Sequence, residues 1–337
     1  MSTLDTFSRP LKDLRISVTD RCNFRCPYCM PAEIFGERYQ FLPRKELLSF
    51  EEITRLARIF ANLGVTKIRL TGGEPLLRTG LPELVKMLSE VSGIEDLALT
   101  TNGFLLDKHA EKLKEAGLNR ITISMDSLDN AVFQQMNGRG FSTDQVLSGI
   151  EAAERAGLNP IKINAVIQRS VNDHSIVDLV NHFKTKGHIV RFIEFMDVGT
   201  LNGWDLEQVV PANEIVNIVG KEHPIEPVTA NYSGEVALRY RFTDGSGEFG
   251  IIPSVTQPFC STCTRMRLSP DGHFYTCLFS DKGFNIRDAL RDGQTDSSIE
   301  SLIRDIWTNR TDQYSQLRAS ISDKTTRPKV EMYHIGG

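Results

Sequence analysis

Short apolar segments alternate with longer amphipathic segments over the first 195 residues. The apolar segments have the length of β-strands, and the segments between them have the apolar spacing of helices. The predicted strands are Leu14–Val18, Lys67–Thr71, Leu97–Thr101, Arg120–Met125, Ile161–Ile167 and Ile189–Phe195. The predicted helices are Glu51–Leu63, Leu81–Val91, Asp107–Ala116, Thr143–Ala156 and Ser175–Lys186. Such alternation predicts an α/β fold with a parallel sheet covered by helices.

The predicted strands have polar and cationic side chains on one face. In the second strand Ile68 and Leu70 share one face, and Arg69 lies on the other. Arg15 in the first strand and Lys162 in the fifth also lie opposite the apolar residues. Strands with helices on both faces would be nearly continuously apolar. We therefore predict a partial, TIM-like (β/α)6 barrel with helices outside and an interior that holds a large polar ligand. The alternative is an antiparallel sheet with a solvated face.

The pattern changes after about residue 200. The segments predicted there are a helix over Pro211–Glu222, β-like pieces over Ile225–Val228, Val236–Tyr240 and Glu248–Ile252, and helices over Ile286–Arg291 and Ser298–Trp307. The last residues, His334–Gly337, have little helix propensity. We predict a barrel over residues 1–220 and a C-terminal α+β extension over residues 221–337 that closes it.

The composition is that of an ordinary globular protein, with 40% hydrophobic and 24% charged residues among 337. The formal net charge of −4 argues against a protein that coats nucleic acid or an anionic membrane. No apolar run approaches the roughly 18 residues of a membrane span, and the first residues lack the apolar core of a secretory signal. We expect a cytoplasmic protein with no nucleic-acid or membrane partner.

Three of the six cysteines directly follow the first predicted strand. Cys22, Cys26 and Cys29 have the spacing C-x3-C-x2-C. They lie at the carboxyl end of a strand, where α/β barrels have their active sites. In a reducing compartment, grouped cysteines indicate metal binding or catalysis more often than disulfides. No histidine precedes His109, so a closed zinc site has no fourth ligand nearby. Three thiolates therefore favour an iron–sulfur cluster with one open iron.

The second cysteine group has the spacing C-x2-C-x13-C. A histidine, His273, lies inside it and would complete a three-cysteine, one-histidine zinc site. Arg265 and Arg267 directly follow the first two cysteines, and cations there suit an anionic substrate at a second open-iron cluster. Spacing alone leaves both interpretations open. These cysteines are Cys260, Cys263 and Cys277.

The first cysteine spacing, with Tyr28 before the third cysteine, resembles the signature of the radical S-adenosylmethionine (SAM) superfamily. In that superfamily the open iron binds SAM, and reductive cleavage of SAM releases a 5′-deoxyadenosyl radical. The segment Gly72–Pro75 resembles the superfamily's GGEP motif, which contacts the SAM amino group and includes Gly73. The resemblance also implies SAM contacts for Ser124 and Met196.

The second cysteine segment, CSTCTRMR followed by CLF, is similar to the auxiliary-cluster region of the GTP 3′,8-cyclase family of molybdenum cofactor biosynthesis. The TNG, SMDSLD and RFIEFMDVG segments and the terminal double glycine extend the resemblance over nearly the whole chain. It implies a lyase that binds SAM and two [4Fe–4S] clusters, one for each cysteine group, and converts GTP into 3′,8-cyclo-7,8-dihydroguanosine triphosphate. The family uses no histidine at the position of His273, which favours the second cluster over zinc.

The same resemblance implies roles for the interior cations. The expected GTP contacts are Arg15, Arg69, Thr100, Lys162, Arg265, Met266 and Arg267. The open iron of the second cluster would bind guanine. Arg15, Arg265 and Arg267 are the expected catalytic residues, with Arg15 helping to quench the radical after cyclisation. Arg191 lies on the opposite strand face from Met196, and its role stays open.

The resemblance further implies that the Gly336–Gly337 end reaches the active-site pocket. It also implies an electron donor such as a flavodoxin or ferredoxin, and a downstream cyclic pyranopterin monophosphate synthase. The protein is expected to be a monomer or homodimer. Two alternatives remain: a radical SAM peptide- or protein-modifying enzyme with an auxiliary cluster, and a zinc-binding interaction module. The first would have a peptide-binding extension and more than three C-terminal cysteines.

Overall fold

The computed structural model describes residues 3–318 and 329–336. Twelve strands form one sheet, in the order β12-β11-β10-β1-β2-β3-β4-β5-β6-β9-β8-β7. The first six are β1 (Asp13–Ser17), β2 (Lys67–Thr71), β3 (Asp96–Thr101), β4 (Arg120–Ser124), β5 (Lys162–Ile167) and β6 (Ile189–Glu194). The others are β7 (Ile225–Val228), β8 (Leu238–Phe242), β9 (Glu248–Ile252), β10 (Arg265–Leu268), β11 (His273–Tyr275) and β12 (Phe284–Asn285).

Strands β1 to β6 are parallel and lie in chain order, so the predicted α/β fold is confirmed. Two later strands join the same sheet in parallel: β10 pairs with β1, and β9 pairs with β6. The outermost strands on both sides are antiparallel to their neighbours. The C-terminal part of the chain thus extends both edges of the six-stranded sheet. The domain boundary at residue 220 stays a prediction.

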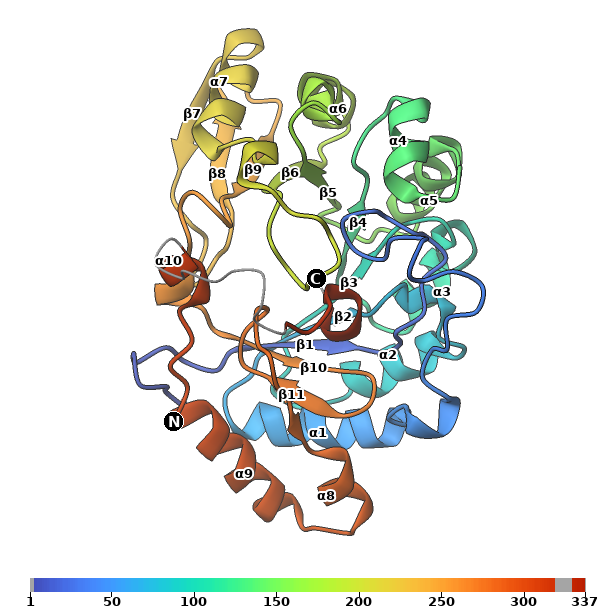
Figure 1. The fold of residues 1–337 in the computed structure, drawn as a ribbon, viewed down its shortest axis with the longest axis vertical. Helices are drawn as coiled ribbons and strands as arrows, with labels where there is room; N and C mark the ends of the chain where they lie inside the picture. The colour runs from blue at the N-terminus through green and yellow to red at the C-terminus, as the bar shows by residue number, and fades with distance from the viewer. Residues whose placement is uncertain (1–2, 319–328, 337) are drawn as a thin grey trace.

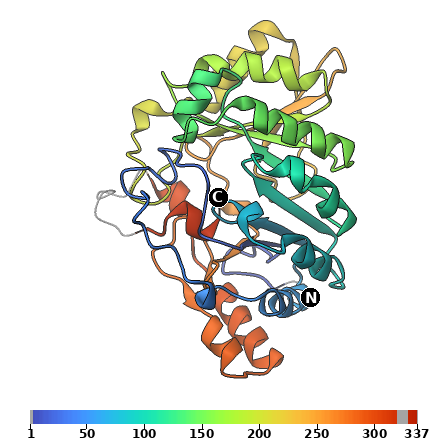
Figure 2. The ribbon, with the colours of Figure 1, turned by 90° about the vertical axis from the view of Figure 1, so that its right-hand side faces the viewer.

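Helices cover the outer side of the curved sheet, and the C-terminus lies toward its inner side (Figure 1). Figure 2 shows the strands behind this layer from the side. The first six helices are α1 (Phe50–Asn62), α2 (Leu81–Ser89), α3 (Ala110–Glu115), α4 (Asn130–Asn137), α5 (Thr143–Arg155) and α6 (Ile176–Lys184). The others are α7 (Ala212–Glu222), α8 (Arg287–Arg291), α9 (Asp296–Thr308), α10 (Tyr314–Leu317) and α11 (Met332–Ile335).

Helix α1 illustrates how the sequence forms this outer layer. Ser49 and Glu52 make a capping box, in which each side chain accepts a hydrogen bond from the backbone N–H of the other residue. Ile53, Leu56 and Phe60 then recur on one face and are buried in the main core. Burying each such side chain stabilises the fold by about 1.5–3 kcal/mol. The core therefore lies between helices and sheet and leaves the inner face of the sheet for polar residues.

The structure differs from the prediction at the C-terminus, where little helix propensity was expected. Residues Met332–Ile335 form the short helix α11. Tyr333 and Ile335 are buried, so packing against the rest of the protein outweighs the weak local preference. Gly337 lies outside the described residues. Among the residues that the structure describes, no helix has both the length and the apolar character needed to cross a membrane.

Candidate active site

The first cysteine loop follows β1 and is held by a buried arginine. The Arg25 side chain donates hydrogen bonds to the carbonyl oxygens of Cys22, Phe24 and Phe35 at 2.6–2.7 Å. The turn after Cys26 is closed by hydrogen bonds from the backbone N–H groups of Cys29 and Met30 to the Cys26 carbonyl oxygen. These contacts fix the loop's backbone, and the three cysteine residues are half-buried.

The thiols of this loop lie in a weakly polar environment. The Cys22 sulfur accepts long hydrogen bonds from Phe24 N at 3.4 Å and from Asn102 Nδ2 at 3.9 Å. Burial raises the pKa of Cys22 to about 12 and also raises the pKa values of Cys26 and Cys29. In the thiolate form, the three groups repel one another. Thiolates here would be stabilised by a soft metal centre, whose positive charge offsets both burial and repulsion.

The predicted SAM-binding residues come from this loop and from segments at the carboxyl ends of β2, β4 and β6. The Tyr28 hydroxyl donates to Asp126 Oδ2 at 2.7 Å, and Asp126 also accepts from the backbone N–H of Val166. Burial raises the pKa of Asp126 to about 6. Asp126 therefore ties the loop to the ends of β4 and β5. Ser124 is the last residue of β4, and Met196 follows β6 and lines the central cavity.

The Gly72–Gly73 turn packs on the backbone just before the cysteine loop. Gly73 N donates to the Thr19 carbonyl oxygen at 2.8 Å, and a Cβ at position 73 would collide with the carbonyl of Arg21. Gly73 is thus required by local packing, whether or not it contacts a cofactor. The next residue, Glu74, is buried and accepts from Thr101 Oγ1 at 2.6 Å and Asn102 N at 2.7 Å. Burial raises the pKa of Glu74 to about 7.

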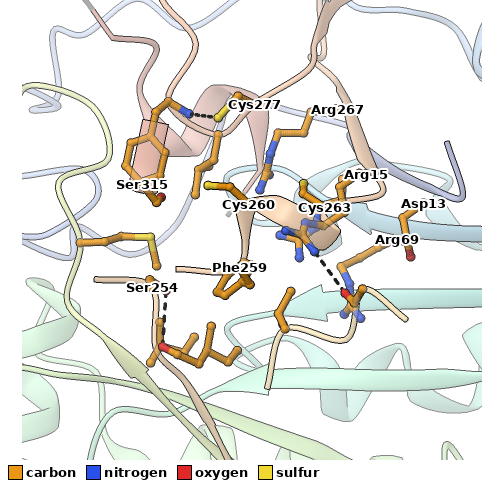
Figure 3. A pocket seen from close by; sticks show the side chains of 18 of the residues that line it. Asp13, Arg15, Arg69, Ser254, Phe259, Cys260, Cys263, Arg267, Cys277 and Ser315 are labelled. Atoms are coloured by element: carbon orange, nitrogen blue, oxygen red, sulfur yellow. Dashed lines mark hydrogen bonds between the residues drawn. The ribbon is translucent and has the colours of Figure 1, made fainter. Parts of the chain in front are cut away.

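A large cavity lies on the inner side of the sheet, next to the second cysteine group (Figure 3). Its empty volume, including the part open to solvent, is about 1530 Å³. Its lining contains seven Lys and Arg side chains and only two Asp side chains. Six of the predicted GTP-site or SAM-site residues line it, together with all three cysteines of the second group and Arg191, whose role was left open. The six are Arg15, Arg69, Thr100, Met196, Arg265 and Arg267.

The register of the sheet explains why the cations meet. Arg15 lies opposite Arg69 on β2 and opposite Arg267 on β10, so three arginines stand side by side on adjacent strands. Like charges in direct register destabilise a sheet unless something compensates them. Arg15, Arg69, Arg191, Arg265 and Arg267 have no carboxylate within 4.0 Å among the described residues. This row of cations is the arrangement expected for a polyanionic ligand.

Burial and mutual repulsion lower the pKa values of these cations. Burial lowers the pKa of Arg69 to about 10 and that of Arg191 to about 9, and neighbouring arginines add to the effect. Burial, then Arg267 and Arg69, lower the pKa of Arg15. Lys162 has a pKa of about 7 because of burial and of Arg191. An anion in the cavity would relieve all of these costs together.

Some predicted contacts lie outside the residues that line the cavity. The Met266 side chain alternates with Arg265 and Arg267 on β10 and is fully buried in the main core, so its side chain faces away from the cavity. Lys162 is on β5, close enough to Arg191 to affect its charge, but does not itself line the cavity. Their roles as GTP contacts stay predictions.

Several residues that line the cavity were not predicted from the sequence. Lys67 has the same strand face as Arg69, which was a usable signal. Asn164 accepts from Arg191 Nε at 2.9 Å. Tyr232 and Phe259 lie in loops, and no periodic pattern in the sequence predicts where a loop residue lies. The Lys67 Nζ atom is 4.0 Å from the centre of the Tyr232 ring, and the Arg265 guanidinium stacks on the Phe259 ring.

His273 is separate from the second cysteine group. Its Nδ1 lies 3.2 Å from Asp271 Oδ2, and it does not line the cavity that the three cysteines share. Among the described residues, no three Cys, His, Asp or Glu side chains are close enough together to hold one metal ion. The second group therefore offers three soft thiol donors, which suit an iron–sulfur cluster by their chemistry, and no preformed four-ligand zinc site.

The C-terminal helix lies between the two cysteine sites. The Tyr333 and Tyr39 hydroxyls are 2.9 Å apart, which joins α11 to the segment after the first cysteine loop. Arg267 donates to the Gly336 carbonyl oxygen, and Gly336 packs tightly on Thr71 with φ of +72°. Only glycine adopts this conformation without strain in so narrow a space. The described end of the chain thus contacts a cavity arginine.

Two family models match the chain, and between them they cover most of it. One, described as the Radical SAM superfamily, matches residues 16–183, and one described as Molybdenum Cofactor Synthesis C matches residues 188–316. A protein named GTP 3′,8-cyclase from Acidothermus cellulolyticus is 51% identical over 356 residues, covering 99% of this chain and 98% of the relative. One of the same name from Staphylococcus haemolyticus is 51% identical over 335 residues, with the same coverage. The chain belongs to the GTP 3′,8-cyclase family.

Solved structures share the fold of this family member. SuiB from Streptococcus suis bound to S-adenosylmethionine has a TM-score of 0.61 at 17% identity and covers 95% of this chain and 76% of SuiB. The protein anSMEcpe with bound AdoMet and a peptide has a TM-score of 0.57 at 16% identity, covering 96% and 94%. At such identities the likeness shows the fold alone. Family membership favours the cyclase interpretation over the peptide-modifying and zinc-module alternatives.

Proposed function

We propose that this protein converts GTP into 3′,8-cyclo-7,8-dihydroguanosine triphosphate, the first step of molybdenum cofactor biosynthesis. The observation that supports this most directly is a row of arginines that pair with no carboxylate in the described part of the chain and lie beside three cysteines in one cavity. The chain is also 51% identical to a protein named GTP 3′,8-cyclase. A triphosphate supplies several negative charges, and the adjacent thiols offer a metal centre to the rest of the nucleotide.

Two [4Fe–4S] clusters fit the two thiol groups. Cys22, Cys26 and Cys29 would hold the first, and Cys260, Cys263 and Cys277 the second. With SAM bound, the first cluster would supply the radical chemistry that removes the hydrogen from C3′ of GTP and lets C3′ join C8 of guanine. Tyr28, Gly73, Ser124 and Met196 would position SAM.

The chain's own cations would orient GTP. Arg15, Arg69, Lys162 and the newly found Lys67 would hold the triphosphate, with Thr100 donating a hydroxyl. Arg265 and Arg267 would hold the nucleotide beside the second cluster, and Met266 would contribute only through its backbone. Positioning accounts for a large part of such a barrier, because C8 and C3′ must be held face to face. Arg15, next to Arg69 and Arg267 in register, is the proposed residue that assists the quenching of the radical.

Several partners belong to the same proposal. A reduced electron-transfer protein such as flavodoxin or ferredoxin would reduce the first cluster, and a cyclic pyranopterin monophosphate synthase would use the product. We place the enzyme in the cytoplasm, as a monomer or homodimer, and divide it at residue 220 into the barrel and its C-terminal extension.

An anaerobic turnover assay tests the proposal. The protein, reconstituted with iron and sulfide, is supplied with dithionite and SAM, and 5′-deoxyadenosine is measured with GTP, with ATP or with no nucleotide. We expect GTP to stimulate 5′-deoxyadenosine formation and to be consumed, and ATP to do neither. Formation of 5′-deoxyadenosine that ignores GTP would contradict the substrate. No 5′-deoxyadenosine from fully loaded protein would contradict the radical chemistry.

A matched pair of variants tests the first thiol group in this assay. Cys26→Ser is expected to abolish 5′-deoxyadenosine formation, whereas Ser261→Ala, next to a second-group cysteine, is expected to retain it. Equal activity of the two variants would contradict the assignment of the first cluster.

A further inference from the structure

Arg310 makes the only direct contact, among the described residues, between a guanidinium group and a cysteine sulfur. Its Nη2 lies 3.2 Å from Cys263 Sγ, and its Nη1 donates to the carbonyl oxygen of the same cysteine at 2.8 Å. One side chain thus fixes both the backbone and the sulfur of Cys263. Arg310 lines the cavity and follows α9, far from the second cysteine group in the sequence.

The guanidinium is held rigidly by buried partners. Its side chain is 1% exposed. Its Nη1 lies 3.4 Å from the fully buried carboxylate of Asp5, and its Nε lies 3.2 Å from the carboxylate of Asp312, which is 29% exposed. Its face stacks on the Trp307 ring, with 4.5 Å between Cζ and the ring centre. A guanidinium with these contacts cannot swing away from the sulfur without leaving buried charges unpaired.

A second arginine completes the arrangement from the N-terminal segment. Arg9 Nε lies 2.6 Å from Asp5 Oδ2, and Arg9 Nη1 donates to the Cys260 carbonyl oxygen at 2.7 Å. Asp5 therefore orients two arginines, one on each of the first two cysteines of the group. The buried set of Asp5, Arg9 and Arg310 has no counterpart at the first cysteine loop, where Arg25 contacts carbonyl oxygens only.

The contact places positive charge directly at one ligand sulfur of the group. The Arg310 guanidinium lies 3.2 Å from Cys263 Sγ, whereas the Cys277 sulfur accepts a hydrogen bond from the backbone N–H of Phe279 at 3.5 Å. Hydrogen bonds to ligand sulfurs and nearby positive charge make an iron–sulfur cluster easier to reduce.

We propose that Arg310, positioned by Asp5 and Arg9, raises the reduction potential of the second cluster through its charged hydrogen bond to Cys263. The inference rests on the proposed second cluster. The role of Arg310 follows neither from the cysteine motif nor from the row of cavity arginines. In this proposal the reduction potential of the second cluster depends on a residue that donates a hydrogen bond to a ligand sulfur.

The test measures each cluster alone in the full-length chain. In one background Cys22, Cys26 and Cys29 are replaced by Ser, leaving the second site; in the other Cys260, Cys263 and Cys277 are replaced, leaving the first. Arg310→Gln and Arg310→Lys are added to each, and midpoint potentials are measured by redox titration with electron paramagnetic resonance, together with iron and sulfide content. Arg304→Gln, an arginine on α9 that pairs with Glu300, is the matched control.

We expect Arg310→Gln to shift the second-site potential to more negative values and to leave the first-site potential unchanged. Arg310→Lys, which retains the charge, should recover most of the shift, and Arg304→Gln should cause none. If Arg310→Gln protein loads no iron at the second site while Arg310→Lys protein does, the contact to Cys263 is supported in a stronger form.

Three results would overturn the inference: an unchanged second-site potential in iron-loaded Arg310→Gln protein, an equal shift at both sites, or a shift that Lys does not reduce. The proposed function fails separately. A second-site background that binds no iron with Arg310 intact, in folded protein, would contradict the second cluster itself and would remove the basis of the inference.

Discussion

The two cysteine sites have the same number of thiols but different surroundings. The first is a single loop, held through its carbonyl oxygens by Arg25, with only neutral donors at the Cys22 sulfur. The second is assembled from distant parts of the chain, and charged arginines reach the carbonyl oxygen of Cys260 and the sulfur of Cys263. The same ligand type is thus placed in two electrostatic environments.

This difference matches the division of work that we propose. The first site has a neutral, desolvated thiol environment, in which added negative charge is unfavourable unless a metal compensates it. Such an environment gives a cluster at the first site no help in accepting an electron. The cationic second site favours electron-rich and anionic groups. The two groups of three cysteines thus differ in the charge that surrounding side chains place at their sulfurs.

Removing one cysteine from each site should change the products more than any other substitution considered and should distinguish the roles of the two sites. Cys29→Ala should lower 5′-deoxyadenosine formation by more than about 100-fold, since even residues that only support metal ligands are worth roughly 10- to 100-fold. Cys277→Ala should abolish cyclised product while GTP-independent 5′-deoxyadenosine formation remains measurable. Both products are quantified by chromatography in one anaerobic assay. Loss of 5′-deoxyadenosine in both variants to the same extent would show that the sites do not divide the work.

Removing cations of the second site should weaken GTP binding without affecting SAM. Arg15→Ala and Arg69→Ala each remove a half-buried charged donor worth about 1.5–3 kcal/mol, or roughly 10- to 100-fold in the GTP dissociation constant. Isothermal titration measures both ligands. Arg55→Ala, which breaks an exposed pair with Asp296 on the outer face, is the control and should change neither. A comparable loss of SAM affinity would contradict separate sites.

A smaller effect concerns pH. Burial lowers the pKa of Lys162 to about 7, so in the free protein Lys162 is cationic below this pH and neutral above it. The cationic form binds a triphosphate better, and GTP affinity should therefore fall as pH rises from 6 to 8, by up to about tenfold from this proton. Lys162→Met removes this contribution, whereas protonation of GTP itself affects both proteins. Identical pH profiles for native and Lys162→Met protein would rule out Lys162 as the titrating group.

The smallest effect tests the support of the first site. Tyr28→Phe removes the 2.7 Å hydrogen bond to Asp126, which is worth about 1 kcal/mol, or roughly fivefold in SAM affinity. Tyr240→Phe, on β8 where the ring stacks on Phe249, is the matched control and should leave SAM affinity unchanged. An unchanged SAM dissociation constant in Tyr28→Phe protein would mean that Asp126 does not position the loop for SAM.

The strands and most helices could be predicted because their patterns are local. Alternation along β2 revealed both the buried Ile68 and the inward Arg69. Helix α4 was missed, since its eight residues bury only three side chains and give no clear period. Strand β10 was also missed, because Arg265–Leu268 was interpreted only as part of the cysteine motif.

The candidate site was predictable only in part. The cysteines and the inward cations follow from motif and alternation. Arg191 was left open because strand alternation put it opposite Met196, but β6 ends at Glu194, so the alternation stops before Met196 and both residues line the cavity. The contact between Arg310 and Asp5 joins residues 305 positions apart, and no local pattern carries such information.

The order of strands in the sheet has a consequence for synthesis of the chain. Strand β1 lies between β2 and β10, and the hydrogen-bonded side chains of Asp13 and Thr264 are 251 positions apart. At about 5–20 residues per second, a ribosome needs roughly 10–50 s between them. During this interval one edge of β1, directly before the first cysteine loop, has no partner and is open to pairing with other chains. The last third of the chain thus determines when the first strand becomes protected.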